Sequence, residues 1–291
     1  FNMNHGASPA ESTCYAAVGT SDFYDAATGG SVQTLDVPTR PGYVFAGWYK
    51  EAGCTNRIMT AAPALCADTD YTDGSANWTG TEAVTLYAKW LEPTPDGLDL
   101  DYENERVTGL VADAAYGISG AEVTADANGE TAVQSGWFGT DVSVVKRGVS
   151  ADSSFDSAAE TLAVPARPAA PVGLAAVDET ASGAGDGKIT GVSDTMESRH
   201  ESASGWTAVG SGETEITGLD GGTYYVRYRA VTTGSPSFAG TGATVAVGTT
   251  LSYGTLQFQS SGHGTYEGYN GNMIVVTRTG GSDGEVSVSY A

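Results

Sequence analysis

The sequence is poor in positive charge, histidine, cysteine and long apolar runs. Its 291 residues include 13 lysines and arginines against 35 aspartates and glutamates, a formal net charge of −22. Such a charge repels nucleic-acid phosphates and anionic membrane surfaces, so neither is expected as a partner. The longest strand-like apolar run is 273–276, far short of the roughly 18 residues that a membrane-spanning helix needs.

Signals for secretion and for metal binding through cysteine are also missing. Phe1 opens directly into strand-like sequence without a signal peptide, so we expect the natural chain to begin earlier. Of the three cysteines, Cys54 and Cys66 are closest in sequence, and we predict a disulfide between them. Cys14 could replace either partner. A metal site is less favoured because no histidine lies near a cysteine.

Helical periodicity is nearly absent, and apolar and polar residues alternate with period two. Val84, Leu86, Ala88 and Trp90 share one face of a predicted strand, and residues 224–230 alternate in the same way. The runs are short and end at turns, to which the 40 glycines contribute. The pattern predicts an all-β fold of small sheets or sandwiches.

Proline-rich segments mark boundaries in the chain. Residues 91–97 and 165–171 are expected to run extended and stiff, and a softer boundary lies near 248–250. Tandem β modules bury little surface between neighbours, so we expect a string of modules or a stalk. The predicted modules are residues 1–91, 98–168, 171–248 and 251–291.

The two middle modules resemble each other in sequence. Thr108-Gly109 corresponds to Thr190-Gly191, and each pair follows a basic start. Gly-Glu-Thr, a strand, a Ser-Phe pair and a terminal strand then follow in both modules. We predict an internal repeat.

The first module carries a spaced signature. Phe1–Asn4 is followed by Pro38–Tyr49, which reads Pro-Thr-Arg-Pro-Gly-Tyr-Val-Phe-Ala-Gly-Trp-Tyr, and then by Val84–Trp90. This signature resembles the Listeria–Bacteroides repeat, the B-repeat of internalin-type surface proteins. The resemblance implies a β-grasp-like fold and a role in surface proteins. Trp48 and Trp90 are predicted to supply most of a small core.

Two weaker resemblances cover the rest of the chain. Residues 217–228 are similar to a turn and strand of Ig-like or fibronectin-type modules, which implies sandwiches over residues 98–250. Residues 251–291 are similar to the start of a Calx-beta domain, which implies a partial sandwich. In that family a glutamate at the position of Glu267 helps to bind calcium. Glu267 is thus the predicted metal residue and calcium the cofactor considered, although the acidic partners of that site are missing here.

Motifs for catalysis are weak. Gly280–Gly284 matches G-x-S-x-G around Ser282, but a nucleophile elbow needs a helix after it, and here a strand is expected. We therefore predict a hairpin turn at Ser282. His5, His200 and His263 are isolated, and we predict no catalytic role for them.

Two acidic segments have some of the features of cation sites. Asp126, Asn128 and Glu130 alternate as in a calcium loop, yet they lack its glycine and its distal glutamate. Four carboxylates also alternate along residues 99–105. We favour a plain acidic turn for the first segment and a solvated strand face for the second.

Three further motifs have a structural and a functional interpretation. Residues 183–188 hint at a phosphate loop but lack the following Ser or Thr, so a flexible turn is predicted. Asn77-Trp78-Thr79 is a glycosylation sequon. Trp137-Phe138 and Trp206 would suit a sugar platform if exposed, but core packing is favoured.

The sequence therefore predicts a non-enzymatic, extracellular segment of a bacterial surface protein that acts as adhesin, stalk or fibre. Its expected partners are other domains or copies of the same protein and a host or matrix ligand. One alternative is an accessory region of a secreted enzyme that binds carbohydrate or protein. Another is a filament subunit joined by strand complementation.

The last segment favours a chain that continues beyond residue 291. Its three predicted strands, 255–259, 273–279 and 285–290, form an incomplete sheet with an open edge. We expect either further native sequence or strands from another chain to complete this sheet.

Overall fold

The computed structural model describes residues 1–4, 13–25, 28–32, 35–251, 253–259, 275–281 and 283–287. Its regular elements are β-strands, apart from one short 3-10 turn, in this described part. The predicted all-β fold of small tandem modules is therefore confirmed. The chain divides into two compact units, residues 1–165 and residues 166–291. No helix in the described ranges has the length and apolarity to cross a membrane.

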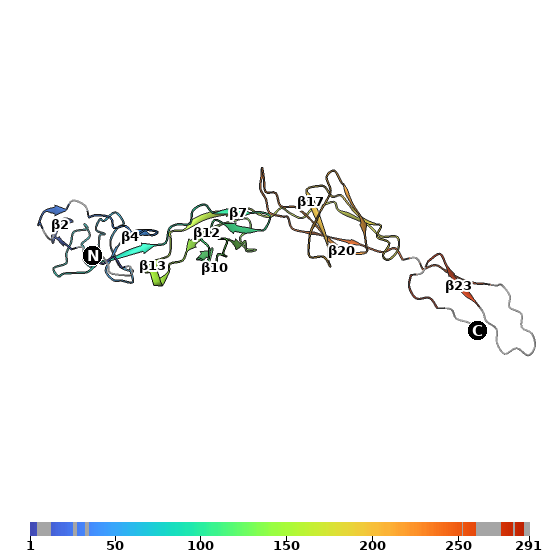
Figure 1. Cartoon of the computed structure of the whole chain (residues 1–291), viewed down its shortest axis with the longest axis horizontal. Helices are drawn as coiled ribbons and strands as arrows, with labels where there is room; N and C mark the ends of the chain where they lie inside the picture. The colour runs from blue at the N-terminus through green and yellow to red at the C-terminus, as the bar shows by residue number, and fades with distance from the viewer. Residues whose placement is uncertain are drawn as a thin grey trace, which may run out of the picture. The chain divides into compact units, whose positions relative to one another are not determined.

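The first module contains two small sheets (Figure 1). One has the strand order β1-β2-β3, and the other has the order β13-β6-β4-β5, in which β13 comes from the second module. No α-helix crosses these sheets in the described residues, so any β-grasp likeness concerns the strands. The strands are β1 Cys14–Ala16, β2 Phe23–Asp25, β3 Ser31–Val32, β4 Val44–Tyr49, β5 Arg57–Met59 and β6 Tyr87–Leu91.

The signature segments of this module form its core. Trp48 in β4 is 3% exposed and Trp90 in β6 is 1% exposed, and both pack in one cluster with Phe45. Gly47 lies at a register shift in β4 with a φ of 126°, and a Cβ there would come within 2.3 Å of the Met59 carbonyl oxygen. Only glycine fits this backbone approach.

The second and third modules are built from the same set of strands. Each has a three-stranded sheet, β11-β8-β7 or β19-β16-β15, and a four-stranded sheet, β10-β9-β12-β14 or β18-β17-β20-β21. The two modules therefore share one topology, as the predicted internal repeat requires. Strands of the second module are β7 Asp99–Asp101, β8 Arg106–Thr108, β9 Ala115–Ile118, β10 Ala121–Thr124, β11 Thr131–Ala132, β12 Thr140–Lys146, β13 Ser154–Phe155 and β14 Glu160–Val164, with the turn η1 Ser150–Asp152. Those of the third are β15 Ala175–Val177, β16 Gly187–Thr190, β17 Met196–His200, β18 Thr207–Ala208, β19 Glu215–Leu219, β20 Gly222–Tyr228 and β21 Ala243–Val247.

The glycine of the Thr-Gly motif has the same structural role in both modules. Gly109 and Gly191 each have a φ of 81°. A Cβ on Gly109 would lie 2.2 Å from the Gly97 carbonyl oxygen, and one on Gly191 would lie 2.4 Å from that of Gly173. The segment that leads into β7 or β15 therefore passes directly over the residue that follows β8 or β16, which only glycine allows.

The core of the third module lies between its two sheets. Ile189 from the three-stranded sheet packs with Tyr224 and Val226 from β20 and with Val245 from β21. The predicted alternation holds along β20, where Val226 is buried and its neighbours are half-buried. The module is a β-sandwich in this sense.

The C-terminal segment contains one described hairpin, with β22 Thr255–Phe258 paired to β23 Val276–Thr279. Residues 285–287, predicted to begin a third strand, are not in a strand, and 273–274 and 288–290 lie outside the described residues. Phe258 is 62% exposed and Tyr253 is 56% exposed. Apolar side chains here are therefore covered little by the described part of the chain.

Candidate functional site

The strongest constellation of buried charge in the first unit lies where the first and second modules meet. Strand β13 leaves its own module and pairs in parallel with β6, with Ser154 opposite Trp90 and Phe155 opposite Leu91. The Glu92 N–H donates to the Phe155 carbonyl oxygen at 2.9 Å. One sheet thus continues across the predicted boundary between the first and second modules.

Glu92 is the central residue of the junction. It is 4% exposed, its Oε2 lies 2.9 Å from Lys146 Nζ, and its Oε1 accepts the Ser154 hydroxyl at 2.6 Å. The Lys146 side chain is 18% exposed. A buried carboxylate is tolerated only when it is paired and hydrogen-bonded, and here both oxygens are engaged.

Signature residues of the first module surround this pair. Arg40 Nη2 donates to the Asp152 carbonyl oxygen at 2.6 Å, and the guanidinium carbon lies 3.8 Å from the centre of the Tyr43 ring. Desolvation, followed by the nearby Asp152 charge, raises the pKa of Tyr43. Lys89 Nζ lies 4.6 Å from the centre of the Phe155 ring. Polar, cationic and aromatic contacts therefore combine across the junction.

The segment that carries β13 is fixed by its own turn. Ser153 is left-handed with a φ of 51°, and a Cβ on Gly148 would lie 2.5 Å from the Ser154 carbonyl oxygen. The Val149 N–H donates to the Ser154 hydroxyl oxygen at 2.8 Å. These contacts within the turn therefore fix the position of Ser154 and Phe155, which pair with β6.

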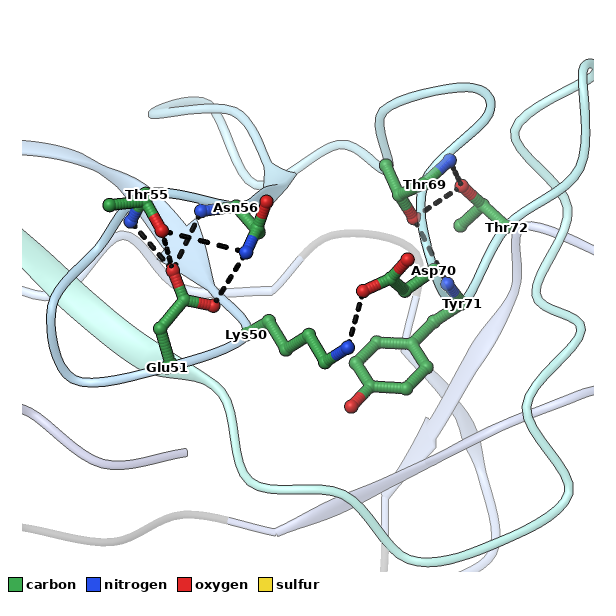
Figure 2. A network of polar contacts seen from close by, with 8 residues as sticks. All are labelled: Lys50, Glu51, Thr55, Asn56, Thr69, Asp70, Tyr71 and Thr72. Carbon is green, nitrogen blue, oxygen red and sulfur yellow. Dashed lines mark hydrogen bonds and ion pairs between the residues drawn. The ribbon is translucent and has the colours of Figure 1, made fainter.

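A second polar network lies in the first module, beyond the end of β4 (Figure 2). Glu51 accepts the N–H groups of Thr55 at 2.7 Å and Asn56 at 2.8 Å, together with the Thr55 hydroxyl. The Thr55 hydroxyl and then the Asn56 N–H lower the pKa of Glu51 to about 2. Figure 2 also shows Lys50 paired with Asp70 beside the Tyr71 ring. The network closes the β4–β5 turn, and a carboxylate so strongly ionised is unsuited to general acid catalysis.

The cysteines do not form the predicted disulfide. Cys14, Cys54 and Cys66 are all free thiols. Cys54 is buried in a left-handed turn with a φ of 51°, and its Sγ contacts the carbonyl oxygens of Ala52 and Ala88 at 3.5 and 3.8 Å. Burial raises the pKa of its thiol to about 11. The thiol is directed toward its own backbone contacts and the neighbouring strand, which accounts for the missing bond.

The two acidic segments are held by protein groups. Arg106 forms ion pairs with both Asp126 and Glu130, so its positive charge offsets part of the negative charge of the calcium-like turn. Asp101 Oδ1 accepts the N–H groups of Glu103 and Asn104 at 3.0 Å, so residues 102–105 form the β7–β8 turn. The predicted single strand face over residues 99–105 is therefore wrong, because the chain reverses there. Among the described residues, no three His, Cys, Asp or Glu side chains are grouped so as to hold a metal ion.

The remaining predicted sites are divided between described and undescribed residues. His5, His263, Glu267 and Ser282 lie outside the described part of the chain. His200 Nδ1 lies 2.7 Å from the Ser202 hydroxyl, but its Nε2 is buried without a partner in the described residues. The pair therefore lacks the third group that orients the base in a triad.

The phosphate-loop and glycosylation motifs are parts of ordinary turns and strands. Lys188 lies in β16, and its ammonium pairs with Glu215 at 3.3 Å. Asn77 donates its N–H to Asp73 at 2.8 Å and its side-chain amide to the same carboxylate at 3.2 Å. A glycan on Asn77 would have to replace the second of these bonds.

The candidate aromatic platform is not a free surface. Trp137 is 5% exposed and belongs to the interior of the second module, as favoured from the sequence. Trp206 carries the Arg227 guanidinium 3.9 Å from its ring centre and that of Arg199 at 5.0 Å. Arginine therefore occupies the ring contacts that a sugar would use.

Among the described residues, the buried Glu92 and Glu179 and the half-buried Lys146 are charged groups that the sequence did not predict to lie inside. Glu179 is 2% exposed, and the Thr249 hydroxyl and the backbone N–H groups of Gly221, Gly183 and Gly185 lower its pKa. Nothing in the sequence marks these charges as buried. Glu92 stands at the start of a segment interpreted as a linker, and its partners lie far along the chain.

Comparison with known proteins concerns the first module. Residues 14–89 match the family model of the Listeria-Bacteroides repeat domain. The first module is similar to this repeat. Such repeats are typical of surface and extracellular proteins. No curated protein matches the chain. The junction thus joins a module similar to the Listeria-Bacteroides repeat to a module of two packed sheets.

Proposed function

We propose that this chain is a non-enzymatic spacer of a bacterial surface or secreted protein, which holds other parts of that protein away from the cell. The observation that carries the proposal is the first module docked onto the next by strand pairing and by the buried Glu92 paired with the half-buried Lys146. Docked modules hold a fixed mutual orientation better than modules joined by a linker alone. A fixed orientation of neighbouring modules suits a stalk.

The form of the sandwich modules supports the same role. Their sheets have the strand order expected of Ig-like and fibronectin-type modules, with three strands facing four. The Tyr224 hydroxyl donates to the Asp220 carbonyl oxygen at 3.1 Å, at the turn before β20. This is the geometry of the tyrosine corner in such sandwiches. We assign the second and third modules to this class as part of the proposal.

A replacement experiment separates the spacer from an adhesin. In the parent protein, this segment is exchanged for unrelated β modules of equal length, and surface display and adhesion of intact cells are measured. A spacer predicts that both persist with the replacement and fall when the segment is deleted. Loss of adhesion with display retained would show that this segment itself binds the ligand. Absence of the native segment from the cell exterior, probed by antibody on intact cells, would contradict the proposal altogether.

A further inference from the structure

The repeat and the second module contact each other through a connecting segment that the third module also possesses. Residues 147–159 join β12 to β14, and residues 229–242 join β20 to β21. Each segment contains a Ser-Phe pair, at 154–155 and at 237–238. Because the modules are repeats, the third serves as an internal control for what is special about the second.

The two Ser-Phe pairs have different environments. Phe238 is 0% exposed within the third module, and Ser237 bonds with Val231 of its own segment. Phe155 instead lies against Lys89 of the repeat, while Ser154 donates to Glu92. The second module therefore directs its Ser-Phe pair toward the first module, whereas the corresponding pair of the third module packs within its own module.

A charge difference accompanies this change of direction. β12 and β20 are seven-residue strands that end at Lys146 and at Tyr228 respectively. Their alignment follows from the pairing of their first residues, Thr140 and Gly222, with the terminal strands β14 and β21. Tyr228 thus stands where the second module has the lysine that pairs with Glu92. The third module lacks this partner for a buried carboxylate.

We propose that the face of the repeat formed by Arg40, Tyr43, Lys89 and Glu92 is a recognition surface for the connecting segment of a sandwich module. Its partner supplies an outward Ser-Phe pair for strand addition to β6, a lysine for Glu92 and a carbonyl oxygen for Arg40. The second module meets these requirements and the third does not. The repeat binds its neighbour through this face, and the covalent linker is not needed to hold the two together.

The test uses the full chain with a site for a sequence-specific protease inserted between the exposed residues Pro93 and Thr94. The chain is folded, cleaved in native buffer, diluted, and examined by size-exclusion chromatography and native mass spectrometry. The fragments should co-migrate at micromolar concentration. Separation of the wild-type fragments would show that only the linker joined them, and would overturn the inference.

Two variants and one control locate the binding to this face. Lys146→Met leaves Glu92 without its cation, and Phe155→Ala removes the ring beside Lys89. Each should raise the dissociation constant of the cleaved fragments at least about 10-fold. Lys188→Met removes a lysine paired with Glu215 in the third module and should leave it unchanged.

Each outcome is decisive because folding is checked separately. Tryptophan emission and far-ultraviolet circular dichroism of the uncleaved variants show whether both are folded. If a folded Lys146→Met or Phe155→Ala chain holds its fragments as tightly as the wild type, the recognition face is wrong. If Lys146→Met does not fold, Phe155→Ala alone decides. The result does not depend on where the parent protein acts.

Discussion

Glu51 and Glu179 are each held by several N–H or O–H groups directed at one carboxylate, which favours the ionised form. A group whose pKa is lower in the folded than in the unfolded chain stabilises the fold above its unfolded pKa, about 4.3 for glutamate. That contribution is lost as the pH falls through the folded value. For Glu51 the window runs from about pH 4.3 down to about 2.

Acid titration should reveal this contribution in Glu51→Gln. At neutral pH the variant should melt at a lower temperature than the wild type, because glutamine cannot carry the charge that the Thr55 and Asn56 N–H groups stabilise. The difference should shrink between pH 4 and pH 2 as Glu51 of the wild type becomes protonated. Melting is followed by tryptophan fluorescence. A difference that is constant over this range would rule out Glu51 ionisation as its cause.

Cys54 should be the least reactive of the thiols in the folded chain. Its burial and a pKa of about 11 leave very little thiolate at pH 8. Alkylation by iodoacetamide, followed by peptide mass mapping, should be on the order of 100-fold slower at Cys54 than in chain unfolded by urea. Cys66, which is half-buried, provides the internal comparison. A Cys54–Cys66 disulfide in the unreduced map would contradict the free thiols of the structure.

At the level of elements, strand alternation and turn glycines are the local features from which the sequence predicted structure. Period-two alternation identified strands β6 and β20 because one face of each is buried. The Thr-Gly motif indicated the internal repeat because Gly109 and Gly191 occupy equivalent positions. At each of them another backbone segment comes too close to leave room for a Cβ. The prediction of one strand face over residues 99–105 is wrong because alternating carboxylates have the same sequence pattern on a strand and in a hairpin turn.

Gly109→Ala should test the close approach, with Gly120→Ala as its matched control. Both glycines have positive φ, 81° and 87°, but a Cβ on Gly120 would meet nothing within 4 Å. Strain alone should cost about 1–2 kcal/mol at Gly120. The added clash with the Gly97 carbonyl should raise the loss at Gly109 to about 2–4 kcal/mol. Urea denaturation measures both, and equal losses would show that the strand above can move aside.

At the level of the whole molecule, the excess of acidic residues dominates the electrostatics. With a net charge of −22, repulsion among carboxylates opposes the folded state more than the few ion pairs support it. Raising NaCl from about 10 mM to 300 mM shortens the Debye length from about 30 Å to below 8 Å. The melting temperature should therefore rise with salt. A fall would mean that the ion pairs, such as Arg106 with Asp126 and Glu130, outweigh the repulsion.

The junction is the part of the molecule that the sequence could not predict. Pro93 and Pro95 predicted an extended segment, and their position suggested that Glu92 belongs to a free linker. The pairing of β6 with β13 joins residues that are distant in sequence, and no periodicity or spacing marks such a contact. The Trp48 and Trp90 signature was more informative, because aromatic side chains in a small module have few places other than the core.

The order of synthesis gives the parallel pairing of β13 with β6 a further meaning. A chain emerges from the ribosome with its N-terminus first, so Trp90 and Glu92 are exposed well before Phe155 exists. During that interval this end of β6 is an open strand edge, which invites pairing with other chains. A charged residue at such an edge discourages wrong partners. Glu92 would therefore protect the nascent repeat first, and become the buried anchor of the junction only when Lys146 and Ser154 arrive.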